Sequence, residues 1–324
     1  MDCEKLIQNI KDKYFDNMNN IRLIFAIGET LFDIIFKNGQ PVASTPGGSL
    51  LNTAVSLGRL GLKIHLISEY GKDAVGNLID EFLVSNGVNT DFVYRYDDNP
   101  SSLALAFLDE NNNAEYNFYK QYLNRRLDIE FPILTDNDIV IYGSFYGIEQ
   151  SVHYRIKPFL EHANEKKAIV IYDPNFRKSH LSEMDTYKPI IMKNFEYADI
   201  VKGSDEDFFY IFGTQTAIES WKKISKMCDM LVYTANKNNV ELYMPNIHQS
   251  YSVPLINPIS TIGAGDTFNA GMISGLISND VSKNNLKKII KSQRAAIVEQ
   301  AIKFAGHVCM SYENYISKDF VDDL

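Results

Sequence analysis

The sequence predicts an α/β protein with a mostly parallel central sheet, covered by helices on both faces, and a small β-sheet lid. Apolar runs typical of strands alternate with helical runs along most of the 324 residues. This alternation is the pattern of a parallel sheet connected by crossover helices. Segments at about 31–46 and 92–123 interrupt it with short strands of alternating polarity. We expect these two segments to form an antiparallel lid on the body.

The body strands are short runs rich in Ile, Val, Leu and aromatic residues. In chain order they are expected at 22–29, 63–71, 138–146, 168–173, 199–203, 230–235 and 240–245. The helices show apolar positions three and four residues apart, as Leu50, Ala54 and Leu57 do. Helices are expected at 49–61, 73–87, 153–166, 188–198, 204–213, 217–227 and from 263 onward.

Local signals mark the helix ends and the lid turns. Gly61 stops the first helix, and Asp73 caps the second. An Asn38–Gly39 turn joins the first two lid strands. We divide the chain into an N-terminal extension at 1–20 and a single domain at 21–324 that carries the inserted lid strands. No repeat or linker indicates a second domain.

The composition narrows the class of protein. Lys and Arg total 32 against 41 Asp and Glu, which gives a formal net charge of −9. A nucleic-acid-binding protein usually carries a basic surface, so we do not expect this protein to bind nucleic acid. Cys3, Cys228 and Cys309 lack the spacing of a zinc site or disulfide framework. With no apolar run of membrane-spanning length and no signal-peptide pattern at the N-terminus, we expect a cytoplasmic protein without membrane contact.

The stretch "GAGD" at 263–266 stands where a helix begins. The first amides of a helix have no intrahelical acceptor, and the helix dipole adds partial positive charge there. Gly263, Ala264 and Gly265 would let an anion approach those amides closely. Asp266 beside this anion hole should stay ionised and could accept a proton from an attacking hydroxyl group.

Taken alone, "GAGD" has plainer explanations. Gly263 and Gly265 could shape a tight turn that Asp266 caps. A dinucleotide-binding fingerprint fits poorly, because Phe268 stands at the third glycine position and the motif lies near the C-terminus. An oxidoreductase is therefore a remote alternative, and the Walker ATP-binding motif is absent.

Several motifs together resemble the ribokinase-like (PfkB) family of carbohydrate kinases. They occur in the family's order over about 22–312, and they are "PGGSLLNTAVSLGRLG", "GKDAVGNLIDEFLVSNGV", "IYDPNFR", "ADIVKGSDEDFFYIFG" and "STIGAGDTFNAGMISGL". The resemblance implies a three-layer α/β body with a β lid and a sugar held between them. It also implies phosphoryl transfer from ATP with Mg²⁺.

The resemblance assigns roles to individual residues. Asp266 matches the catalytic base, and 263–265 match the anion hole. The residues that match the family's sugar-binding positions are Asp33, Gly47, Gly48 and Asn52. Lys120 matches a position where relatives often carry a basic residue that touches substrate. Arg177 follows a strand end and could pair with the transferring phosphate or with an acidic substrate group; a plain surface arginine is the alternative.

The chain departs from the family pattern on the nucleotide side. The family's "N-x-x-E" appears as Ser204 to Asp207, so Asp207 is expected to act on magnesium through water. Its "T-x-G" appears as Thr234, Ala235 and Asn236, which together with Ser204, Gly263 and Gly265 are expected near the nucleotide. Ser260 replaces an aspartate that commonly helps to hold a monovalent cation, so dependence on K⁺ is left open.

The expected function is ATP-dependent phosphorylation of a monosaccharide, with fructose or a related ketose first. The "GETLFD" and "DPNFR" stretches resemble fructokinases and 2-keto-3-deoxygluconate kinases. Kinases of 2-keto-3-deoxygluconate, ribose or a nucleoside are the alternatives, together with a non-catalytic sugar-binding relative. Exposed β edges are usually covered, and relatives often pair through their lids, so we expect a homodimer formed there.

Overall fold

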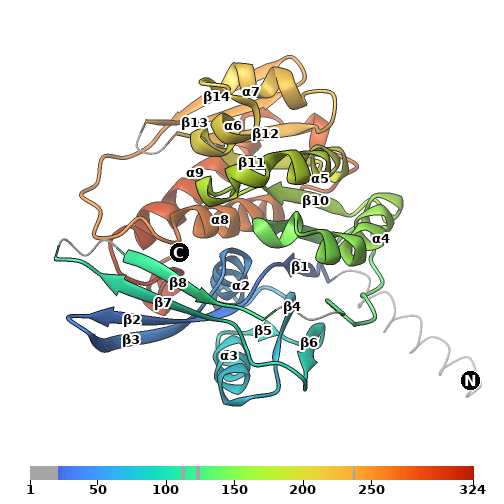
Figure 1. The fold of residues 1–324 in the computed structure, drawn as a ribbon. Helices are drawn as coiled ribbons and strands as arrows, with labels where there is room; N and C mark the ends of the chain where they lie inside the picture. Colours follow the sequence, from blue (N-terminus) through green and yellow to red (C-terminus); the bar gives the residue numbers. More distant parts are fainter. Residues whose placement is uncertain (1–20, 111–113, 122–124, 236–237) are drawn as a thin grey trace, which may run out of the picture.

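The computed structural model describes residues 21–110, 114–121, 125–235 and 238–324. They form a large layered body and a separate small sheet that projects from one side of it (Figure 1). The predicted N-terminal extension, at 1–20, lies outside the described residues. No helix in the described ranges is long and apolar enough to cross a membrane.

The body is built on a ten-stranded sheet with the order β14-β13-β12-β11-β10-β9-β1-β4-β5, in which β6 also pairs with β4. All pairings from β12 through β5 are parallel, whereas β13 and β14 are antiparallel. The predicted mostly parallel sheet is therefore confirmed. The strands are β1 (Ile24–Ile27), β4 (Ile64–Gly71), β5 (Val88–Asn89), β6 (Val93–Tyr96), β9 (Ile139–Gly143), β10 (Ile169–Asp173), β11 (Ile200–Ser204), β12 (Met230–Thr234), β13 (Asn239–Met244) and β14 (Ile247–Ser252).

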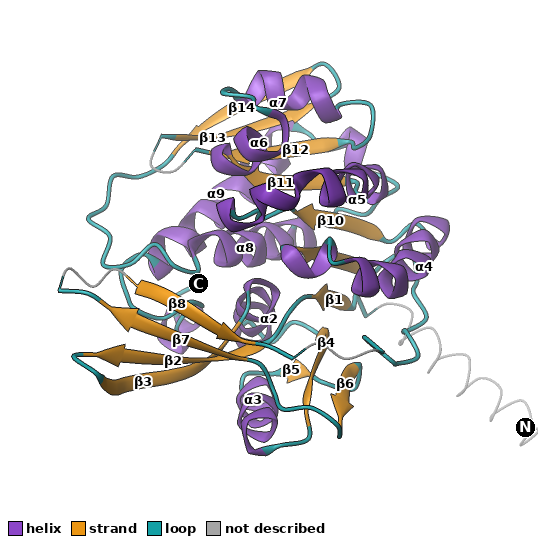
Figure 2. Ribbon diagram, in the orientation of Figure 1, coloured by secondary structure: helices purple, strands orange, loops and turns teal. Residues whose placement is uncertain are grey.

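Helices cover the sheet on both faces (Figure 2). Successive side chains of a strand point to opposite faces of the sheet. In β1, Ile24 and Ala26 therefore belong to one hydrophobic core, and Phe25 and Ile27 belong to the other. The first core packs under α2 (Ser49–Arg59), α3 (Ala74–Ser85), α8 (Ala264–Ser278), α9 (Lys291–Val308) and α10 (Lys318–Asp322). The second packs under α4 (Gln150–Lys166), α5 (Met184–Tyr197), α6 (Asp205–Phe212) and α7 (Ala217–Ile224).

The lid is a four-stranded sheet with the order β3-β2-β7-β8. Its strands are β2 (Leu31–Lys37), β3 (Gln40–Gly47), β7 (Leu103–Leu108) and β8 (Ala114–Tyr119). Both outer pairings are antiparallel, but β2 and β7 pair in parallel. The expectation of a wholly antiparallel lid was wrong, because the chain passes through the body between these two strands and returns in the same direction.

The start of the second predicted lid segment belongs to the body. Strand β6 runs parallel to the end of β4, with Val93 beside Ser68 and Tyr96 beside Gly71. Val93 and Tyr96 are buried, so burial against the body outweighs the alternating pattern that predicted a lid strand. Strand β14 was not predicted, since its sequence IHQSYS is mostly polar and exposed.

Candidate active site

The candidate site lies at the carboxyl-terminal edge of the parallel strands, where the lid meets the body. The N-termini of α2 and α8 meet at this edge (Figure 1), and their side chains are in hydrogen-bond contact. Ligands of open α/β sheets usually bind at this edge.

The start of α8 presents unpaired amides. Gly263 is the N-cap residue with a φ of 79°, which glycine adopts without strain. The Ala264 amide donates to the Thr261 carbonyl at 3.3 Å, whereas the amides of Gly265 and Asp266 have no acceptor within the described part of the chain. A side chain at Gly265 would reach only Lys202, with its Cβ 3.1 Å from Nζ. The amide pair is therefore accessible to an anion.

Two residues of α2 hold the Asp266 carboxylate. Ser49 Oγ donates to Asp266 Oδ1 at 2.6 Å, and Asn52 Nδ2 donates to Oδ2 at 2.8 Å. Thr53 Oγ1 also donates to the Asp266 carbonyl at 2.9 Å. Burial raises the pKa of the Asp266 carboxyl group, and the hydrogen bonds from Ser49 and Asn52 oppose that increase. The arrangement favours an oriented carboxylate that can still accept a proton.

A buried lysine beside the anion hole was missed in the sequence. Lys202, on β11, forms an ion pair with Asp173 at the end of β10, with 3.1 Å between Nζ and Oδ2. Asn269 Nδ2 donates to the same Asp173 oxygen at 2.6 Å. Burial alone lowers the pKa of the Lys202 ammonium group, but nearby carboxylates, Asp173 foremost, raise it overall. The lysine is therefore charged, and the signal for it was a cation within the apolar run "DIVKG".

Asp33 faces Gly47 across the lid hairpin. A Cβ on Gly47 would collide with Asp33 Oδ2, so glycine leaves the space that this carboxylate occupies. Burial raises the pKa of Asp33 to about 6. Its carboxylate makes no hydrogen bond to the described residues, and Tyr116 lies within electrostatic range of both Asp33 and Arg177. Asp33 is thus available to a ligand between lid and body.

Gly48 begins the turn into α2 with a φ of 137°. A Cβ there would collide with the Glu29 carbonyl oxygen, so the turn packs directly against the loop that follows β1. Asn52, expected to reach a sugar, instead contacts Asp266 through its Nδ2, while its buried Oδ1 has no partner in the described structure.

Lys120 and Arg177 differ in their surroundings. Lys120 Nζ lies 2.7 Å and 2.8 Å from the two carboxylate oxygens of Glu29, and this ion pair ties the lid to the body. Arg177 is exposed after β10, and its side chain makes no hydrogen bond or ion pair with the described residues. Lys120 is therefore neutralised, whereas Arg177 keeps its full hydrogen-bonding capacity.

The predicted nucleotide-side residues fall at the ends of β11 and β12. Ser204 and Thr234 are register partners in these parallel strands. Asn236 lies outside the described residues. Asp207 forms a capping box: its Oδ2 accepts from the Ser204 amide and hydroxyl, both at 2.7 Å, and its Oδ1 accepts from the Phe176 amide at 2.6 Å. Among the described residues, no group of three His, Cys, Asp or Glu side chains could hold a metal ion.

Known proteins are similar to this chain over nearly its full length. Probable fructokinase-2 of Arabidopsis thaliana is 24% identical over 298 residues, which cover 86% of this chain and 90% of the relative. Fructokinase-1 of Oryza sativa subsp. japonica is 24% identical over 303 residues, which cover 88% and 89%.

Two solved structures share the fold. A fructokinase from Vibrio cholerae O395, with fructose, ADP and calcium ion bound, superposes with a TM-score of 0.79 at 20% identity, covering 94% of this chain and 98% of that one. Aminoimidazole riboside kinase from Salmonella enterica, complexed with aminoimidazole riboside and an ATP analogue, gives a TM-score of 0.77 at 16% identity, covering 93% and 99%. Residues 21–308 match the sequence profile of the pfkB family carbohydrate kinases, and the chain therefore belongs to the pfkB family of carbohydrate kinases, as its motifs predicted.

Proposed function

We propose that this carbohydrate kinase transfers the γ-phosphoryl group of ATP to a hydroxyl group of a neutral ketose, with fructose as the first candidate. The observation that carries this proposal is the juxtaposition at the start of α8: the Asp266 carboxylate, the unpaired Gly265 and Asp266 amides and the Lys202 ammonium group. A base, anion donors and a cation at one place are what phosphoryl transfer requires.

The acceptor oxygen would attack the γ-phosphorus while its proton passes to Asp266 and the bond from phosphorus to the β-γ bridging oxygen breaks. The Gly265 and Asp266 amides would bind the oxygens of the migrating phosphoryl group, with Lys202 adding positive charge. Mg²⁺ bound with ATP would neutralise the phosphate charge. Because Mg²⁺ keeps several waters and binds through substrate phosphates, Asp207 would act on it through water.

The lid contacts support a neutral acceptor. Both Glu29 oxygens engage Lys120, so this lysine offers no unpaired charge to a carboxylate. Asp33 would accept hydrogen bonds from sugar hydroxyl groups, and Asn52 would contact the acceptor through its unpartnered oxygen, beside the Gly47–Gly48 turn. Of the two cations expected at the sugar, Arg177 is then the one left to pair with a sugar acid such as 2-keto-3-deoxygluconate. The fructokinase names among the relatives support the same choice.

Coupled detection of ADP release, with ATP, magnesium and a panel of sugars, tests this function. We expect turnover with fructose and loss of about 10³-fold or more in kcat for Asp266→Asn, since the base is removed. Binding of sugar without turnover on any acceptor would instead identify a non-catalytic relative. Turnover that survives Asp266→Asn would place the base elsewhere. Assays with and without K⁺ would show whether the activity depends on this ion, a question that Ser260 at the family's aspartate position leaves open.

We also propose a homodimer formed through the lid. Edge strands β3 and β8 carry exposed apolar side chains: Val42 is 58% exposed, Phe118 57% and Tyr119 60%. Such edges tend to be covered in the functional assembly. Light scattering should give twice the chain mass at micromolar concentration. A monomer there would contradict the dimer.

A further inference from the structure

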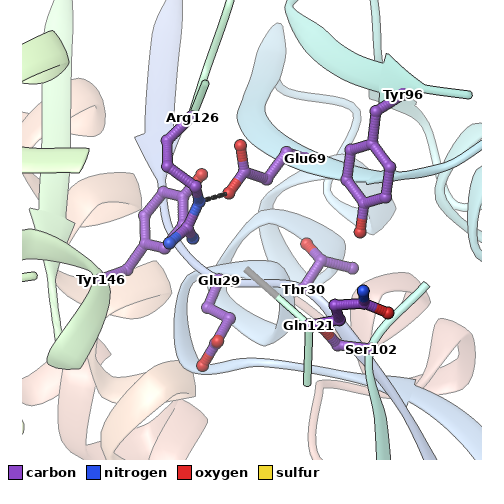
Figure 3. A pocket seen from close by; sticks show the side chains of 8 residues that line it. All are labelled: Glu29, Thr30, Glu69, Tyr96, Ser102, Gln121, Arg126 and Tyr146. Carbon is purple, nitrogen blue, oxygen red and sulfur yellow. Dashed lines mark hydrogen bonds and ion pairs between the residues drawn. The ribbon is translucent and has the colours of Figure 1, made fainter. Parts of the chain in front are cut away.

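A small cavity is lined in part by Glu29 (Figure 3), the residue whose carboxylate forms the ion pair that joins lid and body. Its lining includes Glu29, Thr30, Glu69, Ser102, Arg126 and Tyr146. The volume is about 10 Å³, which is room for a single water-sized group. A hydroxyl group fits such a space, whereas a carboxylate or phosphate group does not.

The charges around the cavity are balanced. Glu69 accepts a hydrogen bond from the Arg126 guanidinium group and another, at 2.8 Å, from the Leu127 amide. Figure 3 shows this pair on one wall of the cavity, with Glu29 on another. Glu29 is neutralised by Lys120. Since both lining carboxylates are paired with a cation, the cavity suits an uncharged polar group.

One lining residue has an unmet hydrogen bond. Tyr146 is 2% exposed, and its hydroxyl group has no partner among the described residues. A buried hydroxyl group without a partner is costly. A ligand hydroxyl group in the cavity would give the Tyr146 hydroxyl group a hydrogen-bond partner. Ligands that carry a hydroxyl group there should therefore bind more tightly.

A chain of contacts links the cavity to the proposed base. The Glu29 carbonyl packs against Gly48, and the next residue, Ser49, donates to Asp266. These contacts place Glu29, which lines the cavity, next to the start of α2, which holds the proposed base.

We propose that this cavity is a subsite for one hydroxyl group of the acceptor, at the end of the sugar opposite the reacting carbon, and that Tyr146 makes it selective for that hydroxyl group. The inference rests on the proposed function and refines it. An analogue that lacks the matching hydroxyl group leaves the buried polar group of the site without a hydrogen bond, so the site discriminates strongly against that analogue.

Calorimetric titration of the full chain with D-fructose, 1-deoxy-D-fructose and 6-deoxy-D-fructose tests the subsite. One of these two analogues lacks the distal hydroxyl group, which is the one at the end of the sugar opposite the reacting carbon. We expect the native protein to bind that analogue about 10-fold more weakly than fructose. Tyr146→Phe should weaken fructose binding by a similar factor and leave that analogue unchanged. The matched control is Tyr251→Phe, which removes another buried, unpartnered hydroxyl group, on β14 at the far edge of the sheet, and should alter neither affinity.

Equal weakening of both sugars by Tyr146→Phe, or no change in either, would overturn the subsite. Turnover measurements on the same samples separate this inference from the kinase proposal. Discrimination without turnover would retain the subsite and remove the kinase function. Turnover without discrimination would support the kinase function and contradict the subsite. A protein that binds no ketose would contradict both the subsite and the kinase function.

Discussion

Lys202 Nζ lies 3.1 Å from Asp173 Oδ2, and their side chains are only 6% and 1% exposed. A buried ion pair gains little net stability over apolar side chains of the same volume, because both charges lose their hydration. The same ammonium group lies beside Gly265 at the start of α8. Its position therefore indicates a role toward a bound anion, with Asp173 keeping the lysine charged and oriented.

Lys202→Met should reduce kcat by about 10²-fold or more, because a preorganised positive charge at the migrating phosphoryl group is lost. The KM for sugar should change little. Folding should weaken by about 3–5 kcal/mol, since Asp173 is left as an unpaired buried charge. Steady-state kinetics and urea unfolding measure the two effects.

The double variant Lys202→Met with Asp173→Asn is the control for that experiment. It removes the uncompensated charge, so most of the stability should return while kcat stays low. If kcat recovers together with stability, the lysine serves the fold alone.

Asp33 should make sugar binding depend on pH. Burial raises its pKa to about 6 from the ordinary 3.8, so the carboxylate form is lost as the pH falls through 6. The KM for sugar should rise below that pH if the carboxylate accepts hydroxyl hydrogen bonds. Asp33→Asn should show a high KM that no longer varies over this range. A KM that is flat with pH in the native protein would contradict the assignment.

The same shift predicts that Asp33 costs stability. An acid whose pKa is raised by folding lowers the free energy of unfolding when it is ionised. This loss of stability is absent below pH 3.8, grows between pH 3.8 and about 6, and is complete above pH 6. Asp33→Asn should therefore stabilise the protein above pH 6, by at most about 3 kcal/mol, and leave it unchanged at pH 3.5. Urea unfolding at the two pH values measures the difference.

The body of the fold could be predicted because its signals are local. The apolar strand runs, the Asp73 cap and the glycines at 263 and 265 are each visible within a few residues. The buried Lys202–Asp173 pair exists only because β11 pairs with β10, and no local pattern specifies that neighbourhood. The placement of β6 and the parallel β2–β7 pair depend equally on long-range pairing.

The candidate site was predictable in part for the same reason. The sequence motifs named Gly47, Gly48, Asn52 and Asp266. They did not name Ser49, and they assigned Asn52 to the sugar, whereas its amide donates to the Asp266 carboxylate. Ser49 Oγ reaches Asp266 across 217 residues of sequence, through the packing of α2 against α8. Only the folded arrangement brings such a pair together.

Gly47→Ala should damage the sugar site, because the new Cβ would collide with Asp33 Oδ2. We expect the KM for sugar to rise by about 10-fold or more and stability to fall by about 1–3 kcal/mol. Gly306→Ala is the matched control, since it lies in α9 with open space around the added methyl group. That change should stabilise the helix by up to about 1 kcal/mol and leave the KM unchanged. A similar KM in both variants would contradict the tight packing of Asp33.

Ser49→Ala should shift the pH profile of kcat/KM. The Ser49 hydroxyl group donates to Asp266 Oδ1 at 2.6 Å and opposes the increase in pKa that burial causes. Without this donor the Asp266 pKa rises further, and the base loses its charge at a higher pH. The acidic limb of kcat/KM should therefore move up by about one pH unit. Ser49→Thr keeps the hydroxyl group and should retain the native profile, so an alanine profile that coincides with the threonine profile would mean that Ser49 does not control the base.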